Sequence, residues 1–78
     1  MYARVKKVQP LENYLLKLTF DNNEVRIFDV SPYLDKGIFQ ELKDQTIFKT
    51  VVPFMGTVMW KNEQDFCPDT LYEESVLI

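Results

Sequence analysis

The sequence predicts an α+β fold with a three-stranded antiparallel meander, short helical turns, a second β-hairpin and a C-terminal helix. Residues 14–30 alternate apolar and polar side chains with the period of two that is typical of half-buried strands. Ser31 and Pro32 then interrupt the alternation and favour helical turns, and Val51–Lys61 returns to a strand-like pattern. A chain of 78 residues has room for one domain, so residues 1–78 form a single predicted unit.

The central hairpin is predicted to turn at Asn22–Asn23, because Asn tolerates the positive φ of a two-residue type I′ turn. Phe20 then pairs with Val25, although Asp21 and Glu24 become a like-charge pair that slightly disfavours this register. In this register Phe28 belongs to the mostly polar face. The predicted buried face contains Leu16, Leu18, Phe20, Val25 and Ile27.

The segments on either side of this hairpin carry turn and strand signals of their own. Residues 2–11 resemble a strand in which a bulge near Lys6–Lys7 restores the alternation, and Pro10 suits a strand end. Glu12–Asn13 is predicted to turn the chain into the hairpin. These features complete the meander.

The helical turns are predicted from capping residues. Ser31 is a suitable N-cap and Pro32 a suitable first residue for a turn over Pro32–Lys36, which Gly37 ends. Asp44 can cap a second turn that ends at Phe48.

The last third of the chain predicts a hairpin and a helix. Met55–Gly56 lies near the turn of the hairpin, and Pro53 places its first strand at an edge. Val58 and Trp60 share one side of the second strand, opposite Thr57 and Met59. Pro68 opens a helix over Pro68–Ser75, with Asp69 in the first turn and with Leu71 and Tyr72 facing inward.

The charge of the chain is uneven. The net charge is −3, and residues 61–78 carry five acidic groups against Lys61. This distribution does not match the clustered Lys and Arg of a nucleic-acid-binding surface, although a dipolar surface can steer a basic partner. The chain has one cysteine, no secretory segment and no apolar run long enough for a membrane span, so we expect a soluble cytoplasmic protein.

Three blocks form a spaced signature: FDVSPYL at 28–34, F-x2-L-x-D-x3-F at 39–48 and W-x4-DFCPDTLY at 60–72. On these blocks the chain resembles a small bacterial family, domain of unknown function 2442, from Val5 to Tyr72. The resemblance implies an α+β domain with a meander, a second hairpin and short helices. It also implies a gene beside another small gene, as in a toxin–antitoxin pair, and it carries over no catalytic residue.

Acidic and sulfur-bearing side chains of the signature are candidates for chemistry. A carboxylate cluster of Asp29, Asp65 and Asp69 could hold a hard cation or act as acid and base. The interpretation we favour is structural: Asp29 and Asp65 bond to backbone donors at turns, and Pro32, Pro68 and Asp69 shape the helix starts. Cys67 is predicted to be a buried, inert thiol, because the chain contains no His to activate it. We therefore expect no metal, cofactor or catalytic residue.

Exposed aromatic and sulfur side chains are the candidate contact residues. Trp60 and Tyr72, together with Phe54, Met55 and Met59, either line an apolar hollow for a ligand or partner, or leave Trp60 and Tyr72 to the core. The second alternative is favoured for those two, because a short chain needs core material. Phe28 and Phe54 are the better predicted interface residues, since an exposed aromatic favours a binding surface.

The function predicted from these features is a non-enzymatic protein-interaction module, the antitoxin-like or regulatory member of a bacterial two-gene pair. A homodimer or a heterodimer is expected, without direct nucleic-acid or membrane binding. The alternative is a small-ligand-binding domain that uses an apolar pocket near Trp60. A third alternative is a hydrolase with paired carboxylates.

Overall fold

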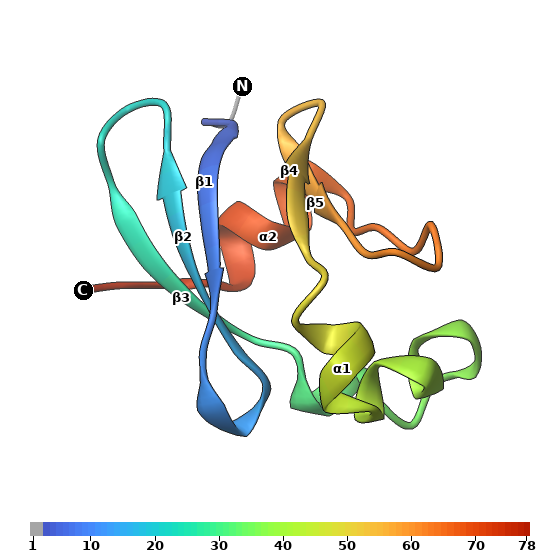
Figure 1. The fold of residues 1–78 in the computed structure, drawn as a ribbon. Coiled ribbons are helices and arrows are strands. Elements are labelled where there is room, and N and C mark those ends of the chain that lie inside the picture. The colour runs from blue at the N-terminus through green and yellow to red at the C-terminus, as the bar shows by residue number, and fades with distance from the viewer. Residues whose placement is uncertain (1–2) are drawn as a thin grey trace.

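The computed structural model of the protein describes residues 3–78, apart from the side chain of Ile38, and confirms the predicted α+β class (Figure 1). Its main sheet is antiparallel, with the strand order β1-β2-β3-β6. The first three strands form the predicted meander. The strands of this sheet are β1 (Val5–Pro10), β2 (Leu15–Phe20), β3 (Val25–Asp29) and β6 (Val76–Leu77).

Strand β1 contains the predicted bulge. Val5 pairs with Phe20 while Lys7 pairs with Thr19, so Lys6 is the extra residue. The bulge lets Val5 reach the core, where it is buried, and turns the neighbouring lysines to solvent. A 3-10 turn at Glu12–Tyr14 then leads into β2, as the sequence predicts.

The predicted register of the central hairpin is wrong by one residue. The loop has three residues, because the Phe20 N–H donates to the Glu24 carbonyl and Asn23 has a φ of 70°. A tight turn followed by a residue with positive φ is the usual three-residue hairpin loop. As a result Thr19, not Phe20, pairs with Val25, and Leu16 pairs with Phe28.

The shift in register reverses the two faces of β3. Phe28, predicted to be exposed, is 1% exposed and packs against Phe66 with ring centroids 5.1 Å apart. Val25 and Ile27, predicted to be buried, lie half-buried on the outer face. The prediction that Phe28 is an exposed interface residue is therefore wrong, because a one-residue slip moves every side chain to the other face.

Strand β6 was not predicted. Its Val76 pairs with Ile27 and its Leu77 with Arg26, and the Ile78 N–H donates to the Val25 carbonyl. The strand is too short to give a period-two pattern in the sequence. It makes β6, rather than β3, the edge of the sheet.

The connection after β3 forms a 3-10 turn at Ser31–Tyr33, a second at Gly37–Lys43 and the helix α1 (Gln45–Phe48). Asp44 caps α1 as predicted, accepting a hydrogen bond from Thr46 N. The first 3-10 turn, predicted over Pro32–Lys36, begins at Ser31 and ends at Tyr33, so Ser31 is its first residue rather than its cap, and Gly37 begins the second turn instead of ending the first.

The second hairpin is confirmed, with β4 (Val52–Phe54) and β5 (Thr57–Met59). Met55 and Gly56 have φ values of 49° and 85°, the left-handed conformations of a type I′ turn. Figure 1 shows this hairpin beside β1. The Val5 N–H donates to the Gly56 carbonyl at 2.9 Å and joins the two sheets.

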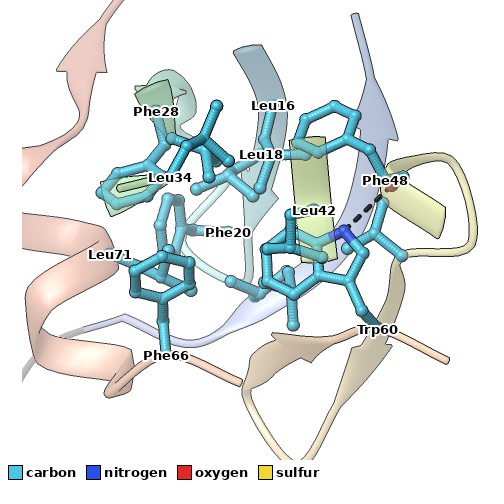
Figure 2. Packing of buried hydrophobic residues seen from close by; sticks show 14 residues of the cluster. Leu16, Leu18, Phe20, Phe28, Leu34, Leu42, Phe48, Trp60, Phe66 and Leu71 are labelled. Carbon is cyan, nitrogen blue, oxygen red and sulfur yellow. Dashed lines mark hydrogen bonds between the residues drawn. The ribbon is translucent and has the colours of Figure 1, made fainter. Parts of the chain in front are cut away.

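The core lies between the inner face of the main sheet, the helical turns, β5 and the helix α2 (Pro68–Glu74) (Figure 2). Leu71 on α2 is fully buried, whereas Glu73 and Glu74 face solvent, as predicted. The largest core side chains come from every part of the chain: Leu16, Leu18, Phe20, Phe28, Leu42, Phe48, Trp60 and Leu71.

Candidate functional site

The signature carboxylates lie at different turns. Asp29 Oδ1 accepts hydrogen bonds from Ser31 N at 2.9 Å and from Ser31 Oγ at 2.6 Å, which confirms its predicted role at this turn. The corresponding prediction for Asp65 is wrong: α2 begins at Pro68 with Cys67 as an N-cap that makes no side-chain hydrogen bond, and among residues 3–78 the backbone of Asp65 forms a bridge to Met59 while its side chain accepts no hydrogen bond. Across residues 3–78, no three His, Cys, Asp or Glu side chains are grouped in a way that could hold a metal ion.

Cys67 is exposed, which corrects the predicted buried thiol. The helix start is in the predicted place, but the neighbouring Phe66 supplies the buried side chain there, with 6% of its surface exposed. Backbone geometry at the N-cap turns consecutive side chains in different directions, so Cys67 faces outward. Its thiol belongs to the surface rather than to the core.

Trp60 is a core residue. It is 1% exposed, and its indole N–H donates to the buried Phe48 carbonyl at 2.9 Å, as the dashed line in Figure 2 marks. Tyr72 is half-buried and meets Phe20 edge to face at 5.1 Å. The favoured assignment of these two residues to the core is thus confirmed, and neither presents an open aromatic surface.

The other predicted contact residues come together on the second hairpin. Val52 pairs with Met59 and Phe54 pairs with Thr57, so these four side chains share one face of the hairpin, on which Thr57 is buried and Val52 and Phe54 are exposed. Val52 is 48% exposed and Phe54 41%, while Met55 at the turn is 75% exposed. We call Val52, Phe54, Met55 and Met59 the hairpin patch.

The hairpin patch contains a strained backbone residue and lies beside a cationic side chain. Met55 holds a left-handed conformation that bulky residues rarely adopt. Arg4 Nη2 donates to the Met55 carbonyl at 2.6 Å, and a β-carbon on Gly56 would collide with the Arg4 guanidinium. The hairpin patch is therefore bordered by an exposed positive charge that is fixed in place by the turn.

The sequence prediction missed Val52 and Arg4. The spacing of two residues between Val52 and Phe54 is a sequence signal that could have identified Val52. Nothing in the sequence indicates that Arg4 contacts a turn 51 residues away.

A second polar group, formed by Glu24, Arg26 and Tyr72, was also missed. Glu24 directly precedes β3 and Arg26 lies on its inner face, where the Arg26 guanidinium lies 4.2 Å from the Tyr72 ring centroid. The Tyr72 hydroxyl donates to Glu24 Oε1 at 2.8 Å, and Arg26 Nε pairs with the same oxygen at 2.9 Å. Arg26 Nη1 also donates to the Ser75 carbonyl at 3.1 Å, so the group fastens the end of α2 to the sheet.

These contacts alter the acid–base properties of both charged groups. The hydrogen bond from Tyr72, followed by that from Arg26, lowers the pKa of the Glu24 carboxyl. Partial burial disfavours the charged form of Arg26, but the hydrogen bonds to Glu24 and Tyr72 outweigh it and raise the pKa of the guanidinium. Both groups are charged at neutral pH and hold each other in place.

One hollow lies near Trp60, as the ligand-binding alternative requires. It has a volume of about 270 Å³ and is lined by Ile47, Lys61 and Asn62. The Asn62 amide donates to Glu41 Oε2 at 2.7 Å, which fixes its orientation. Trp60 itself is buried and is not among the described lining residues.

Taken together, the fold and the surface define a small α+β domain with an apolar hairpin patch. The chain belongs to the family described as Protein of unknown function (DUF2442), whose model matches residues 5–76. No curated protein and no solved structure matches the chain. Within residues 3–78, no helix has the length and apolar character needed to cross a membrane.

Proposed function

We propose that this chain is a non-enzymatic protein-interaction module, the antitoxin-like or regulatory member of a bacterial two-gene pair, acting as a cytoplasmic homodimer or heterodimer. The observation that supports this proposal is the hairpin patch. Three of its side chains expose between 41% and 75% of an apolar surface that water solvates poorly.

The chemistry of the hairpin patch fits a protein partner. Aromatic and Met side chains are enriched at protein interfaces, and Arg is enriched among the residues that dominate binding energy. Phe54 and Met55 supply the apolar anchors and Arg4 the cation. A partner that places an apolar side chain against Phe54 and a carboxylate near Arg4 would cover the apolar anchors and pair with the cation.

Strain at the turn supports the same proposal. A type I′ turn favours Asn-Gly, and Met at its first central position costs about 1 kcal/mol or more. Retaining a strained, exposed Met55 is consistent with a role in contact rather than in folding.

The test is co-expression of the tagged chain with the product of the gene adjacent to its own. The wild-type chain is expected to co-purify with that product, and Phe54→Ser is expected to weaken the complex at least tenfold, as loss of a moderate anchor does. Leu77→Ser is the matched control, because Leu77 is 55% exposed and lies outside the hairpin patch. Absence of co-purification, or equal loss with both variants, contradicts the proposal.

The hollow at Ile47, Lys61 and Asn62 favours a second candidate, a small-ligand-binding domain. An apolar wall, a cation and an oriented amide suit a small carboxylate with an apolar tail. A thermal-shift screen with such carboxylates tests it. If a carboxylate stabilises the wild-type chain and Lys61→Gln abolishes this stabilisation, the result supports the ligand-binding function. If no carboxylate stabilises the wild-type chain, the ligand-binding function is contradicted.

A further inference from the structure

The outer face of the main sheet is formed by two rows of side chains that cross all four strands. One row runs from Lys7 through Thr19 and Val25 to Ile78, and the other from Gln9 through Lys17 and Ile27 to Val76. Directly paired residues in an antiparallel sheet point to the same face. We call these eight residues the open sheet face, because the core lies on the opposite side.

The half of the open sheet face on β3 and β6 is apolar. Val76 is 66% exposed and Ile78 69%, beside the half-buried Val25 and Ile27. On β3 the charged Arg26 points toward the core side, whereas the β-branched Val25 and Ile27 lie on the outer face, beside the exposed Asp29. One-sided sheets normally show the reverse. A surface that covers the open sheet face would account for this inversion.

The half on β1 and β2 is basic. Lys7 and Lys17 form no ion pair with any residue from 3 to 78, and the side chains of Gln9 and Thr19 form no hydrogen bond there. All four line a hollow of about 280 Å³, next to the bulge that increases the local twist. Unpaired donors in a hollow favour an anionic group as the occupant.

We propose that the open sheet face docks an amphipathic helix of a partner protein, with its apolar stripe over β3 and β6 and its carboxylates beside Lys7 and Lys17. A helix is about 10 Å wide and neighbouring strands lie about 4.8 Å apart. The edge of a helix centred over β3 and β6 therefore lies about 2 Å from β2 and about 7 Å from β1, gaps that the side chains of Lys17 and Lys7 and the helix carboxylates can span together. This inference rests on the proposed interaction role but uses a different surface from the hairpin patch.

Charge selects this occupant over two others. A second copy docked face to face would bring four lysines together, which is unfavourable, because the carboxylate on this side of β3, that of Asp29, already accepts hydrogen bonds from Ser31. An anionic membrane would gain roughly a factor of five in affinity from each of two lysines, and the net charge of −3 opposes the approach. A partner helix that carries acidic residues beside an apolar stripe complements both the basic half and the apolar half of the open sheet face.

The test is an NMR titration of the full chain with two designed amphipathic peptides of about 18 residues, or five turns. Both carry the same Leu stripe, bordered by Glu in one peptide and by Lys in the other. The Glu peptide is expected to shift the backbone amides of β1, β2, β3 and β6 and to bind at least tenfold more tightly than the Lys peptide. Added salt is expected to reduce that ratio.

Matched variants assign the effect to the open sheet face. The double variant Lys7→Glu/Lys17→Glu is expected to reverse the preference between the peptides, and Val76→Ser to weaken both by several-fold. All three positions are solvent-exposed, so these variants should fold. Phe54→Ser, in the hairpin patch, is expected to leave peptide binding unchanged.

Four results overturn the proposal: no amide shifts on the open sheet face at millimolar peptide, equal binding of the two peptides, stronger binding to phosphatidylserine vesicles than to the Glu peptide, or self-association through this face in sedimentation. Failure here leaves co-purification through the hairpin patch intact. Failure of co-purification with a positive titration would instead overturn only the role of the hairpin patch.

Discussion

The Arg4 guanidinium donates a hydrogen bond to the Met55 carbonyl across 2.6 Å and so joins the start of β1 to the tip of the second hairpin. The backbone of the next residue strengthens this link, because the Val5 N–H donates to the Gly56 carbonyl. These contacts hold the hairpin patch at a fixed position beside the main sheet. A rigid patch loses less entropy on binding than a mobile one.

The close approach of Arg4 to Gly56 predicts a coupled pair of mutations. Gly56→Ala is expected to destabilise the protein by about 2 kcal/mol, because a left-handed alanine is strained and its β-carbon displaces Arg4. After Arg4→Ala, only the backbone strain remains, so Gly56→Ala should cost about 1 kcal/mol less. A double-mutant cycle in urea measures the coupling. Strict additivity would show that the Arg4 contact does not form.

The buried indole of Trp60 predicts a large loss of stability from a conservative change. Trp60→Phe leaves the Phe48 carbonyl without its donor and creates a cavity, so the free energy of unfolding should fall by about 2–4 kcal/mol. Urea denaturation followed by circular dichroism measures this loss. Phe54→Leu, at an exposed position, should cost less than about 1 kcal/mol. Equal losses would contradict the core position of Trp60.

The lowered pKa of Glu24 predicts a pH-dependent contribution to stability. A carboxyl whose pKa is depressed on folding stabilises the native state above its ordinary pKa of 4.5, and this contribution is lost as the pH falls through the folded-state pKa. The wild type should therefore exceed Glu24→Gln in urea midpoint at about pH 7, and the difference should shrink at about pH 3. A difference that does not change with pH would show that the carboxyl is not held by Tyr72 and Arg26.

The turn after β3 predicts different roles for two acidic residues of the signature. Asp29→Ala removes the acceptor for Ser31 N and Ser31 Oγ and should cost about 1 kcal/mol. Asp69→Ala changes an exposed carboxylate in the first turn of α2 and should cost less than about 0.5 kcal/mol. Thermal unfolding of both variants measures the two losses of stability. A larger loss for Asp69→Ala than for Asp29→Ala would contradict the turn geometry.

The elements that could be predicted from the sequence are those with a strong local signal. The bulge at Lys6, the turn at Met55–Gly56, the cap at Asp44 and the start of α2 at Pro68 are each determined by one or two residues. Their positions depend on backbone preferences that act within a few residues. The core role of Trp60 followed from the scarcity of other core material.

The elements that the prediction missed depend on distant contacts. The register of the central hairpin depends on whether the loop has two or three residues, and the apolar pattern of Val25 and Ile27 favoured the wrong answer. Arg26 could take the inner position only because the Tyr72 ring and the Ser75 carbonyl, 46 and 49 residues later, receive its guanidinium. The same inversion placed Phe28 in the core and left an apolar surface outside.

The central claim is that the hairpin patch exists for contact, and Met55→Asn tests it most directly. An Asn at this position suits the type I′ turn, so the free energy of unfolding should rise by about 1 kcal/mol. The same substitution removes the most exposed side chain of the hairpin patch, so affinity for the co-purified partner should fall at least tenfold in calorimetric titration. A more stable variant that binds the partner as tightly as the wild type would contradict the claim.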